Sequence, residues 1–312
     1  MKQGLCPPFL VPGAQVAIVA TSFRPDYALV IGLMKFYEDA GYDPHPMGDF
    51  EGFGAFADTD EVRLLYLQAA IDNPNIKAIH FVRGGYGITR IIDRVCFDSY
   101  LNGNLKWMIG YSDVTAVLMQ AANLGLASIH GPMAAQIMGD PAEGVSLLKF
   151  LAGLTNHLSW TTSPHKVQGR LEYEGVLLGG NLTTLAHLAG TNTTPLQAPN
   201  ILVLEDVGEC HYAIDRHFVQ LARSGIVHQD TKAILLGSFT EMRDSEAGFG
   251  YSVLQMAQNH FTTQMGIPVL NGLPIGHGSH NAPLPIGSQV TLQLEGIDAS
   301  LQFAFNSGAH YI

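Results

Sequence analysis

Short apolar stretches alternate with amphipathic ones through the first half of the chain, and this alternation constrains the fold more than any other feature of the sequence. The amphipathic stretches carry apolar residues at helical spacing. Strands joined by helices run parallel in a sheet covered on both faces, so we expect an α/β domain. Its expected strands are 15–20, 78–82, 106–109 and 126–129, and its expected helices are 26–40, 61–71 and 113–123.

The 312 residues are long for one domain, and glycines and prolines interrupt the alternation after about Pro132. We therefore expect the parallel-sheet domain to span 1–138, a crossover to span 139–166, and a smaller α+β domain to span 167–312. The strand-like runs of the second domain are 201–204, 233–236, 289–294 and 301–305, and its helical runs are 214–224 and 251–261.

The composition excludes several classes of function. A net charge of −11 repels phosphate backbones, so we expect no nucleic-acid partner. The chain is 47% hydrophobic and 14% charged, which is typical of a compact soluble protein. Its three cysteines lie far apart without a C-x-x-C pair, which favours a reducing cytoplasm over a disulfide framework or a zinc ribbon.

Two segments could be mistaken for membrane-directed sequences. Prolines at positions 7, 8 and 12 interrupt the apolar run at the start of the chain, so we expect no secretion signal. The uncharged stretch 114–139 contains Gln120, Asn123 and Pro132, and its periodicity changes midway. This pattern favours a helix followed by a strand over a membrane span.

The segment 106–115 places a serine at a strand-to-helix turn. A strand-like run ends at Gly110 and a helical pattern opens at Val114, so Ser112 lies between them. Such a turn lies at the carboxyl edge of a parallel sheet, where α/β folds bind ligands and a helix dipole favours negative charge. Ser112 is therefore a candidate nucleophile. A helix N-cap is the alternative, because the G-x-S-x-G elbow is incomplete.

A glycine-rich turn, Arg83-Gly-Gly-Tyr-Gly87, follows the expected strand 78–82. It lacks the third glycine and the downstream acidic residue of a dinucleotide fingerprint, so we expect no nicotinamide cofactor. Its backbone N–H groups could form half of an oxyanion hole, and a plain tight turn is the alternative.

Three carboxylates follow the apolar run 201–204, namely Glu205, Asp206 and Glu209. A carboxylate there can orient a histidine through its ring N–H and stabilise the imidazolium that forms on proton transfer. The three compete for this role, and a solvated strand end is the alternative.

A histidine between two glycines, His277, lies in a loop with an exposed backbone and is the best candidate for a general base. Two groups of residues could instead bind a metal, but neither has a recognised zinc spacing, so we expect no metal. These groups are His277 with His280, and Cys210 with His211 and His217.

Seven short sequences occur in order along nearly the whole chain. They are RGGYG at 83–87, GYSDVTA at 110–116, HGPM at 130–133, LLGGNL at 177–182, LEDVGE at 204–209, YAIDR at 212–216 and GLPIGHG at 272–278. Together they resemble the LD-carboxypeptidase family, the muramoyl-tetrapeptide carboxypeptidases with a Ser-Glu-His triad.

The resemblance implies a flavodoxin-like N-terminal domain that carries the nucleophile and a smaller C-terminal domain that carries the acid and the base. These roles fall on Ser112, Glu205 and His277. The implied reaction is removal of the terminal D-alanine from murein tetrapeptide, in the cytoplasm, during cell-wall recycling. No cofactor is implied.

We expect the amides of Gly85 and Asp113 to form the oxyanion hole and Arg83 to bind the terminal carboxylate of the substrate. Two alternatives stay open: a microcin C immunity-type peptidase that cleaves peptidyl-nucleotide conjugates, and a non-catalytic peptide-binding protein. Trp160 alone near the domain junction favours the murein substrate over the conjugate. A homodimer is also compatible with the sequence.

Overall fold

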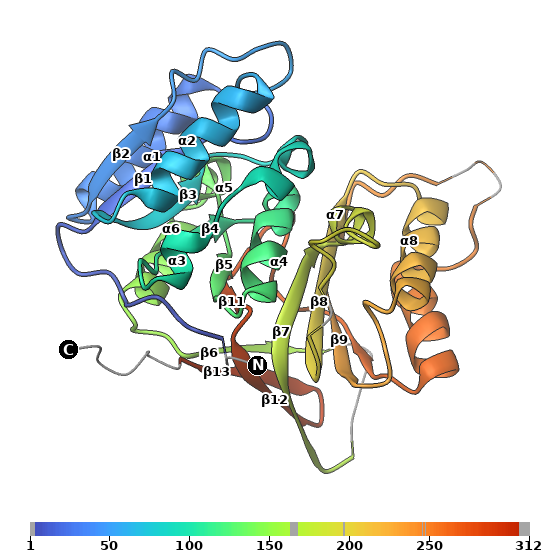
Figure 1. Cartoon of the computed structure of the whole chain (residues 1–312). Helices are drawn as coiled ribbons and strands as arrows, with labels where there is room; N and C mark the ends of the chain where they lie inside the picture. Colours follow the sequence, from blue (N-terminus) through green and yellow to red (C-terminus); the bar gives the residue numbers. More distant parts are fainter. Residues whose placement is uncertain (1–3, 163–167, 196, 245, 247, 306–312) are drawn as a thin grey trace.

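Two β-sheets organise the chain, and they lie next to each other in Figure 1. The computed structural model describes residues 4–162, 168–195, 197–244, 246 and 248–305. Residues 163–166 of the expected crossover and residue 167 of the expected second domain lie outside the described residues. The domain limits at 138 and 166 stay a prediction.

The first sheet has six strands in the order β11-β5-β4-β3-β1-β2. Strands β1 to β5 are parallel, and β11 adds an antiparallel edge from a distant part of the chain. The parallel α/β sheet expected from the alternation is confirmed. The strands are β1 (Gln15–Val19), β2 (Asp43–Met47), β3 (Ile76–Phe81), β4 (Trp107–Gly110), β5 (Ser128–His130) and β11 (Leu284–Ile286).

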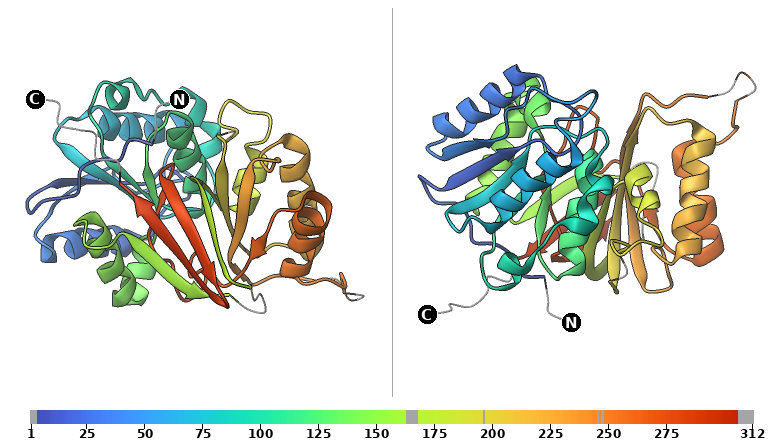
Figure 2. Two further views of the ribbon diagram at one scale, coloured as in Figure 1. Left: turned by 90° about the horizontal axis from the view of Figure 1, so that it is seen from below. Right: turned by 45° about the horizontal axis from the view of Figure 1, so that its top comes forward.

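Helices cover both faces of this sheet (Figure 2), as right-handed crossovers require. One face carries α1 (Tyr27–Asp39), α5 (Ala134–Gly139) and α6 (Pro141–Leu151), which contact one another. The other face carries α2 (Asp60–Asp72), α3 (Asp98–Leu101), α4 (Thr115–Asn123) and the short 3-10 helices η1 (Ile88–Arg90), η2 (Ile92–Arg94) and η3 (Ser112–Val114).

Side-chain caps fix the ends of these helices. Helix α1 begins where Asp26 accepts a hydrogen bond of 2.9 Å from the amide of Ala28. Helix α2 ends against the buried Lys106, whose Nζ donates to the carbonyls of Ala70, Ile71 and Asn73 at 2.7–3.0 Å. A cation suits the negative end of the helix dipole, so Lys106 anchors α2 beside the start of β4.

Strand β2 is absent from the strands expected from the sequence. Its Pro44 and Pro46 lack the N–H groups of a sheet ladder and therefore weaken a strand prediction. The strand nevertheless forms because it lies at the edge of the sheet and pairs only with β1.

The second sheet has seven strands in the order β10-β9-β8-β7-β12-β13-β6. The first four are parallel and the last three pair antiparallel. Its strands are β6 (His157–Thr161), β7 (Arg170–Asn181), β8 (Asn200–Val207), β9 (Thr231–Thr240), β10 (Val269–Leu270), β12 (Gln289–Glu295) and β13 (Asp298–Ala304).

The parallel half of the second sheet lies between helices from both halves of the chain. Helix α4 packs against β7, and α8 (His211–Ser224) lies beyond β8 and β9 on the other side (Figures 1 and 2). The remaining helices are α7 (Leu182–His187), α9 (Val253–Ala257) and the π-helix η4 (Gln258–Thr263). Within the described residues, no helix has both the length and the apolar character needed to cross a membrane.

The chain crosses from the second sheet to the first and back between β10 and β12, within residues 269–295. Strand β11 pairs with β5 in the first sheet, and β12, which follows directly, pairs with β7 in the second. The loop that contains His277 enters this crossing, so both sheets determine its position.

Candidate active site

Ser112 lies on a strained turn between β4 and α4. Its φ of 62° is in the left-handed region, which is uncommon for a residue other than glycine. Neither η3 nor α4 has a side-chain hydrogen bond to its first amides, so Ser112 does not act as an N-cap. A half-buried serine on a strained strand-to-helix turn is the arrangement of a nucleophile elbow, although the G-x-S-x-G sequence is incomplete.

The glycine turn 83–87 lies directly against Ser112. A methyl group on Gly84 would lie 2.8 Å from Ser112 Cβ and 2.9 Å from its Oγ, so only glycine permits this approach. The same point lies 3.4 Å from the amide nitrogen of Asp113. The fold therefore brings together the two turns whose amides were expected to form the oxyanion hole.

The buried side chain of Asp113 holds these turns in place. Its Oδ2 accepts hydrogen bonds from Ser22 Oγ at 2.7 Å and from the amide of Ile88 at 2.9 Å. Burial raises the pKa of this carboxyl. Asp113 thus has a structural role in addition to the amide that sequence reasoning assigned to it.

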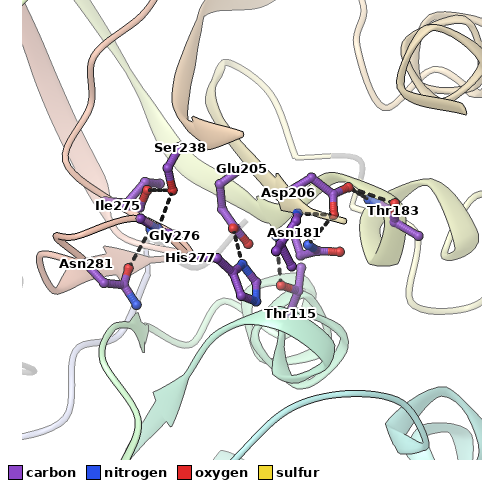
Figure 3. A network of polar contacts seen from close by, with 12 residues as sticks. Thr115, Asn181, Thr183, Glu205, Asp206, Ser238, Ile275, Gly276, His277 and Asn281 are labelled. Atoms are coloured by element: carbon purple, nitrogen blue, oxygen red, sulfur yellow. Dashed lines mark hydrogen bonds and ion pairs between the residues drawn. The ribbon is translucent and has the colours of Figure 1, made fainter. Parts of the chain in front are cut away.

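Glu205 and His277 form a hydrogen-bonded pair in the second half of the chain (Figure 3). Glu205 Oε2 lies 2.7 Å from His277 Nδ1, and the side chain of Glu205 is 0% exposed. The solvated strand end considered for Glu205 is therefore wrong. Since Nδ1 is bound to the carboxylate, Nε2 is the nitrogen that can accept a proton.

The protonation equilibria of the pair are coupled. Burial raises the pKa of Glu205, while the hydrogen bond from His277 acts in the opposite direction. Burial lowers the pKa of His277, but the hydrogen bond and charge of Glu205 outweigh it, and the net pKa of His277 is raised. A histidine with a carboxylate partner is thereby a stronger base than an isolated buried one.

Asp206 has hydrogen-bond partners other than His277. Its Oδ1 accepts from Asn181 Nδ2 at 3.0 Å, and its Oδ2 accepts from the amide and the hydroxyl of Thr183 at 2.9 and 2.7 Å. Asp206 therefore fixes the start of α7 and does not hydrogen-bond to His277. Glu209 lies beyond the end of β8 and is half-buried.

Ser238 on β9 clamps the loop on both sides of His277. Its Oγ donates to the carbonyl of Ile275 at 2.8 Å and accepts from the amide of Gly278 at 2.9 Å (Figure 3). Gly276, with a φ of 102°, lets the loop approach so closely that a methyl group there would lie 2.6 Å from Glu205 Oε2. Sequence reasoning missed Ser238, because a lone serine in a strand carries no local signal.

Tyr111 connects the turn of Ser112 to the loop of His277. Its ring centroid lies 4.7 Å from that of His277 and 5.7 Å from that of His130. Tyr111 directly precedes Ser112, so this contact brings the turn of Ser112 and the loop of His277 to one place. The sequence places Tyr111 beside Ser112, but no pattern in it indicates the contact with His277.

A cleft of about 530 Å³ opens beside the serine turn, between the two halves of the chain. Hydroxyl groups and one exposed carboxylate, Asp93, supply most of its polar character, and no Lys or Arg occurs among the lining residues that the structure describes. The lining consists of Gly85, Tyr86, Thr89, Ile92, Asp93, Asp113, Thr183, Thr184, His187, Leu188, Thr191 and Thr193.

Arg83 is half-buried at the start of the glycine turn and outside the lining of the cleft. Its Nη1 donates to the carbonyl of Arg24 at 2.9 Å, and its guanidinium lies 5.9 Å from the centroid of the Phe23 ring. These contacts hold the guanidinium against Arg24 and Phe23, and it retains further N–H groups for an anion.

The residues considered as metal ligands are not brought together. His277 pairs with Glu205, and His211 pairs with Asp244 at 3.1 Å. In the described part of the chain, the one cluster of three potential ligands within 4.8 Å of one another is Asp140, Glu143 and His280.

Models of both domains of the LD-carboxypeptidase family match the chain, the N-terminal domain over residues 16–131 and the C-terminal domain over residues 174–292. A putative carboxypeptidase from Synechocystis sp. is 34% identical over 306 residues, which cover 97% of this chain and 98% of that protein. A murein tetrapeptide carboxypeptidase from Pseudomonas aeruginosa is 32% identical over 290 residues, with 89% and 93% covered.

Solved structures show the same architecture. The muramoyltetrapeptide carboxypeptidase from Oxalobacter formigenes is similar with a TM-score of 0.83 at 29% identity, over 93% of this chain and 98% of that one. The microcin C7 self immunity protein has a TM-score of 0.80 at 22% identity, over 97% and 99% of the two chains, which shows a shared fold.

Proposed function

The chain belongs to the LD-carboxypeptidase family, and we propose from this that it is a serine carboxypeptidase that removes the terminal D-alanine of murein tetrapeptide. The observation that carries the proposal is the buried Glu205–His277 pair, which Tyr111 joins to the strained turn of Ser112. The names of the relatives favour an enzyme over a non-catalytic binding protein.

The proposed reaction is an acyl transfer in two stages. His277 Nε2 takes the hydroxyl proton of Ser112 as the Oγ attacks the scissile carbonyl, and it then gives this proton to the leaving amine of D-alanine. Water hydrolyses the resulting ester of Ser112, with His277 again acting as the base. Glu205 keeps the imidazole in the productive tautomer and stabilises its charged form.

We assign the oxyanion hole to the amides of Gly85 and Asp113. Both residues line the cleft. A methyl group placed on Gly84, which precedes Gly85, would be in contact range of both Ser112 and the amide of Asp113. In the best-studied serine protease, one such donor contributes about 3–4 kcal/mol to transition-state stabilisation.

Arg83 is our assignment for the terminal carboxylate of the substrate. It directly precedes Gly84, which approaches Ser112, and no Lys or Arg occurs among the described residues that line the cleft. We therefore place the terminal carboxylate beside Arg83. The planar guanidinium suits a carboxylate because it can donate two parallel hydrogen bonds.

Incubation of the protein with a murein tetrapeptide, followed by mass spectrometry, tests the activity. A peptide that ends in D-alanine should lose one residue, and the same peptide ending in L-alanine should react about a hundredfold more slowly. Inversion of the last Cα forces the scissile bond out of line if the carboxylate stays bound, and a misplacement of about 1 Å has such an effect. Equal rates for the two peptides would contradict the murein assignment.

Two further substrates separate the remaining alternatives. A peptidyl-adenylate conjugate tests the immunity-type activity, and its preferential cleavage would replace the murein substrate while leaving the triad intact. A tetrapeptide with a C-terminal amide tests the role of Arg83. The variant Arg83→Met should raise KM for the free acid about tenfold or more, as expected for a lost charge-assisted hydrogen bond, and should have little effect on KM for the amide.

We propose a cytoplasmic location, which the cysteine pattern favours.

A further inference from the structure

We propose that Asn281 is a positioning residue for His277, which it holds in register with the serine turn through hydrogen bonds to the first half of the chain. The inference rests on the proposed serine mechanism and assigns the residue that aligns its base. Asn281 lies four residues after His277, and its side chain is fully buried.

The hydrogen bonds of Asn281 determine the orientation of its amide. Its Oδ1 lies 2.8 Å from the amide nitrogen of Gly276, which can only donate, so this atom must be the oxygen. Its Nδ2 then donates to Gln136 Oε1 at 3.0 Å. Gln136 Nε2 in turn donates to the carbonyl of Gly276 at 2.9 Å. In these three hydrogen bonds, every donor meets an acceptor.

These bonds fix both peptide groups of Gly276. The amide of Gly276 is bound by Asn281, and its carbonyl, which belongs to the peptide bond with His277, is bound by Gln136 on α5. Figure 3 shows the Asn281–Gly276 bond on the side of the loop away from Asp206 and Thr183. The backbone from which the imidazole extends is therefore tied to a helix that packs on the first sheet.

Two further contacts attach Asn281 to the same half of the chain. Its backbone amide donates to Glu143 Oε2 at 2.9 Å on α6, and its Oδ1 also accepts from His130 Nε2 at 3.1 Å on β5. Burial lowers the pKa of His130 to about 3, so this ring is neutral. Because Asn281 Oδ1 can only accept, the proton of the ring lies on Nε2. Asn281 thus contacts three separate elements, α5, α6 and β5.

The physical need for this arrangement comes from the division of the triad. Ser112 follows β4 of the first sheet, whereas Glu205 lies on β8 of the second, and Ser238 binds the His277 loop to the second. Asn281 and Gln136 supply the side-chain hydrogen bonds from this loop to elements of the first half, in addition to the Tyr111 contact and the β11–β5 pairing. A shift of about 1 Å between nucleophile and base is enough to reduce the rate on the order of a hundredfold.

The test compares Asn281→Ala with Asn200→Ala in the full chain. Asn200 is a matched control because it is also fully buried. Its Nδ2 lies 2.7 Å from the carbonyl of Gln197 and 3.1 Å from His228 Nε2, and neither partner belongs to the loop of His277. We expect Asn281→Ala to lower kcat for the D-alanyl tetrapeptide roughly ten- to hundredfold with KM within about threefold, since alignment and not binding is lost.

The rate at which a fluorophosphonate modifies Ser112 should fall by a similar factor, because this reaction also needs the aligned base. Asn200→Ala should keep kcat and the modification rate within about threefold of the wild type. An equal loss of kcat in both variants, or none in Asn281→Ala, would overturn the inference.

A second variant keeps the test decisive if Asn281→Ala fails to fold. Gln136 is only half-buried, and Gln136→Met removes its bond to Gly276 with little change of volume. It should also lower kcat more than it changes KM, and an unchanged kcat would count against the network. If the wild type does not cut the tetrapeptide, the proposed function fails, while the fluorophosphonate rates still decide the role of Asn281.

Discussion

Glu205 Oε2 and His277 Nδ1 lie 2.7 Å apart, and the carboxylate is 0% exposed whereas the imidazole side chain keeps 18% of its surface exposed. Glu205 is thus shielded from water while His277 keeps part of its ring exposed. In the proposed mechanism this asymmetry suits a general base, because its partner orients it without competing for the proton of Ser112.

The strain at Ser112 predicts the behaviour of two substitutions. Both Ser112→Ala and Ser112→Gly should lose nearly all turnover, because each removes the hydroxyl. Ser112→Gly should be more stable than Ser112→Ala by about 1 kcal/mol, since glycine adopts a φ of 62° without the steric cost that a Cβ incurs. Urea denaturation of both variants measures the difference. Turnover of either variant within about tenfold of the wild type would exclude the serine mechanism.

The raised pKa of His277 predicts the acid limb of the pH profile. His277 must be neutral to accept the proton of Ser112, so kcat/KM should fall as the pH drops through its pKa. In Glu205→Gln the charge that raises this pKa is absent and burial, which lowers it, dominates. The acid limb should therefore move to lower pH while the plateau falls about 10⁴-fold, as in related triads. A limb that stays in place would show that another group controls it.

Substitution of two glycines with positive φ should have different effects on activity. Alanine at Gly276 would place a methyl group 2.6 Å from Glu205 Oε2, whereas alanine at Gly225, with a φ of 80°, meets nothing within 4 Å. Both substitutions incur a backbone cost of about 1 kcal/mol, but only Gly276→Ala displaces the acid from the base. Tetrapeptide turnover should thus be nearly lost in Gly276→Ala and unchanged in Gly225→Ala. Similar turnover in the two variants would contradict the role of the close contact.

Asp206 and Glu205 are neighbours in the sequence, and their substitution should have different effects. Asp206→Ala leaves the amide and hydroxyl of Thr183 without their acceptor, so the free energy of unfolding should fall by about 2–3 kcal/mol. Its KM should rise, because α7 lines the cleft, and its kcat should stay within about tenfold. Glu205→Ala should instead lose kcat. Steady-state kinetics at a temperature where both variants are folded separate the two roles.

The local pattern of the sequence was sufficient for much of the fold. Apolar runs at 15–20 and 78–82 become β1 and β3, because a fully buried parallel strand needs an uninterrupted apolar segment. The strand-to-helix turn at Ser112 follows from the change of period after Gly110. Strand β2 could not be found in this way, since its prolines are tolerated only because tertiary pairing leaves it at an edge.

The sequence by itself determined the parallel sheet, the position of Ser112 on its carboxyl edge, and the glycines that flank His277, because each depends on residues close together in the chain. Only the tertiary structure decided which carboxylate serves His277. Glu205 and Asp206 are neighbours near the end of β8, and the packing of the His277 loop places its Nδ1 against Glu205, while Asp206 binds Asn181 and Thr183. The hydrogen bond from Gln136 to Gly276 joins residues that are 140 positions apart in the sequence, and contacts at such a separation leave no periodic pattern in the sequence.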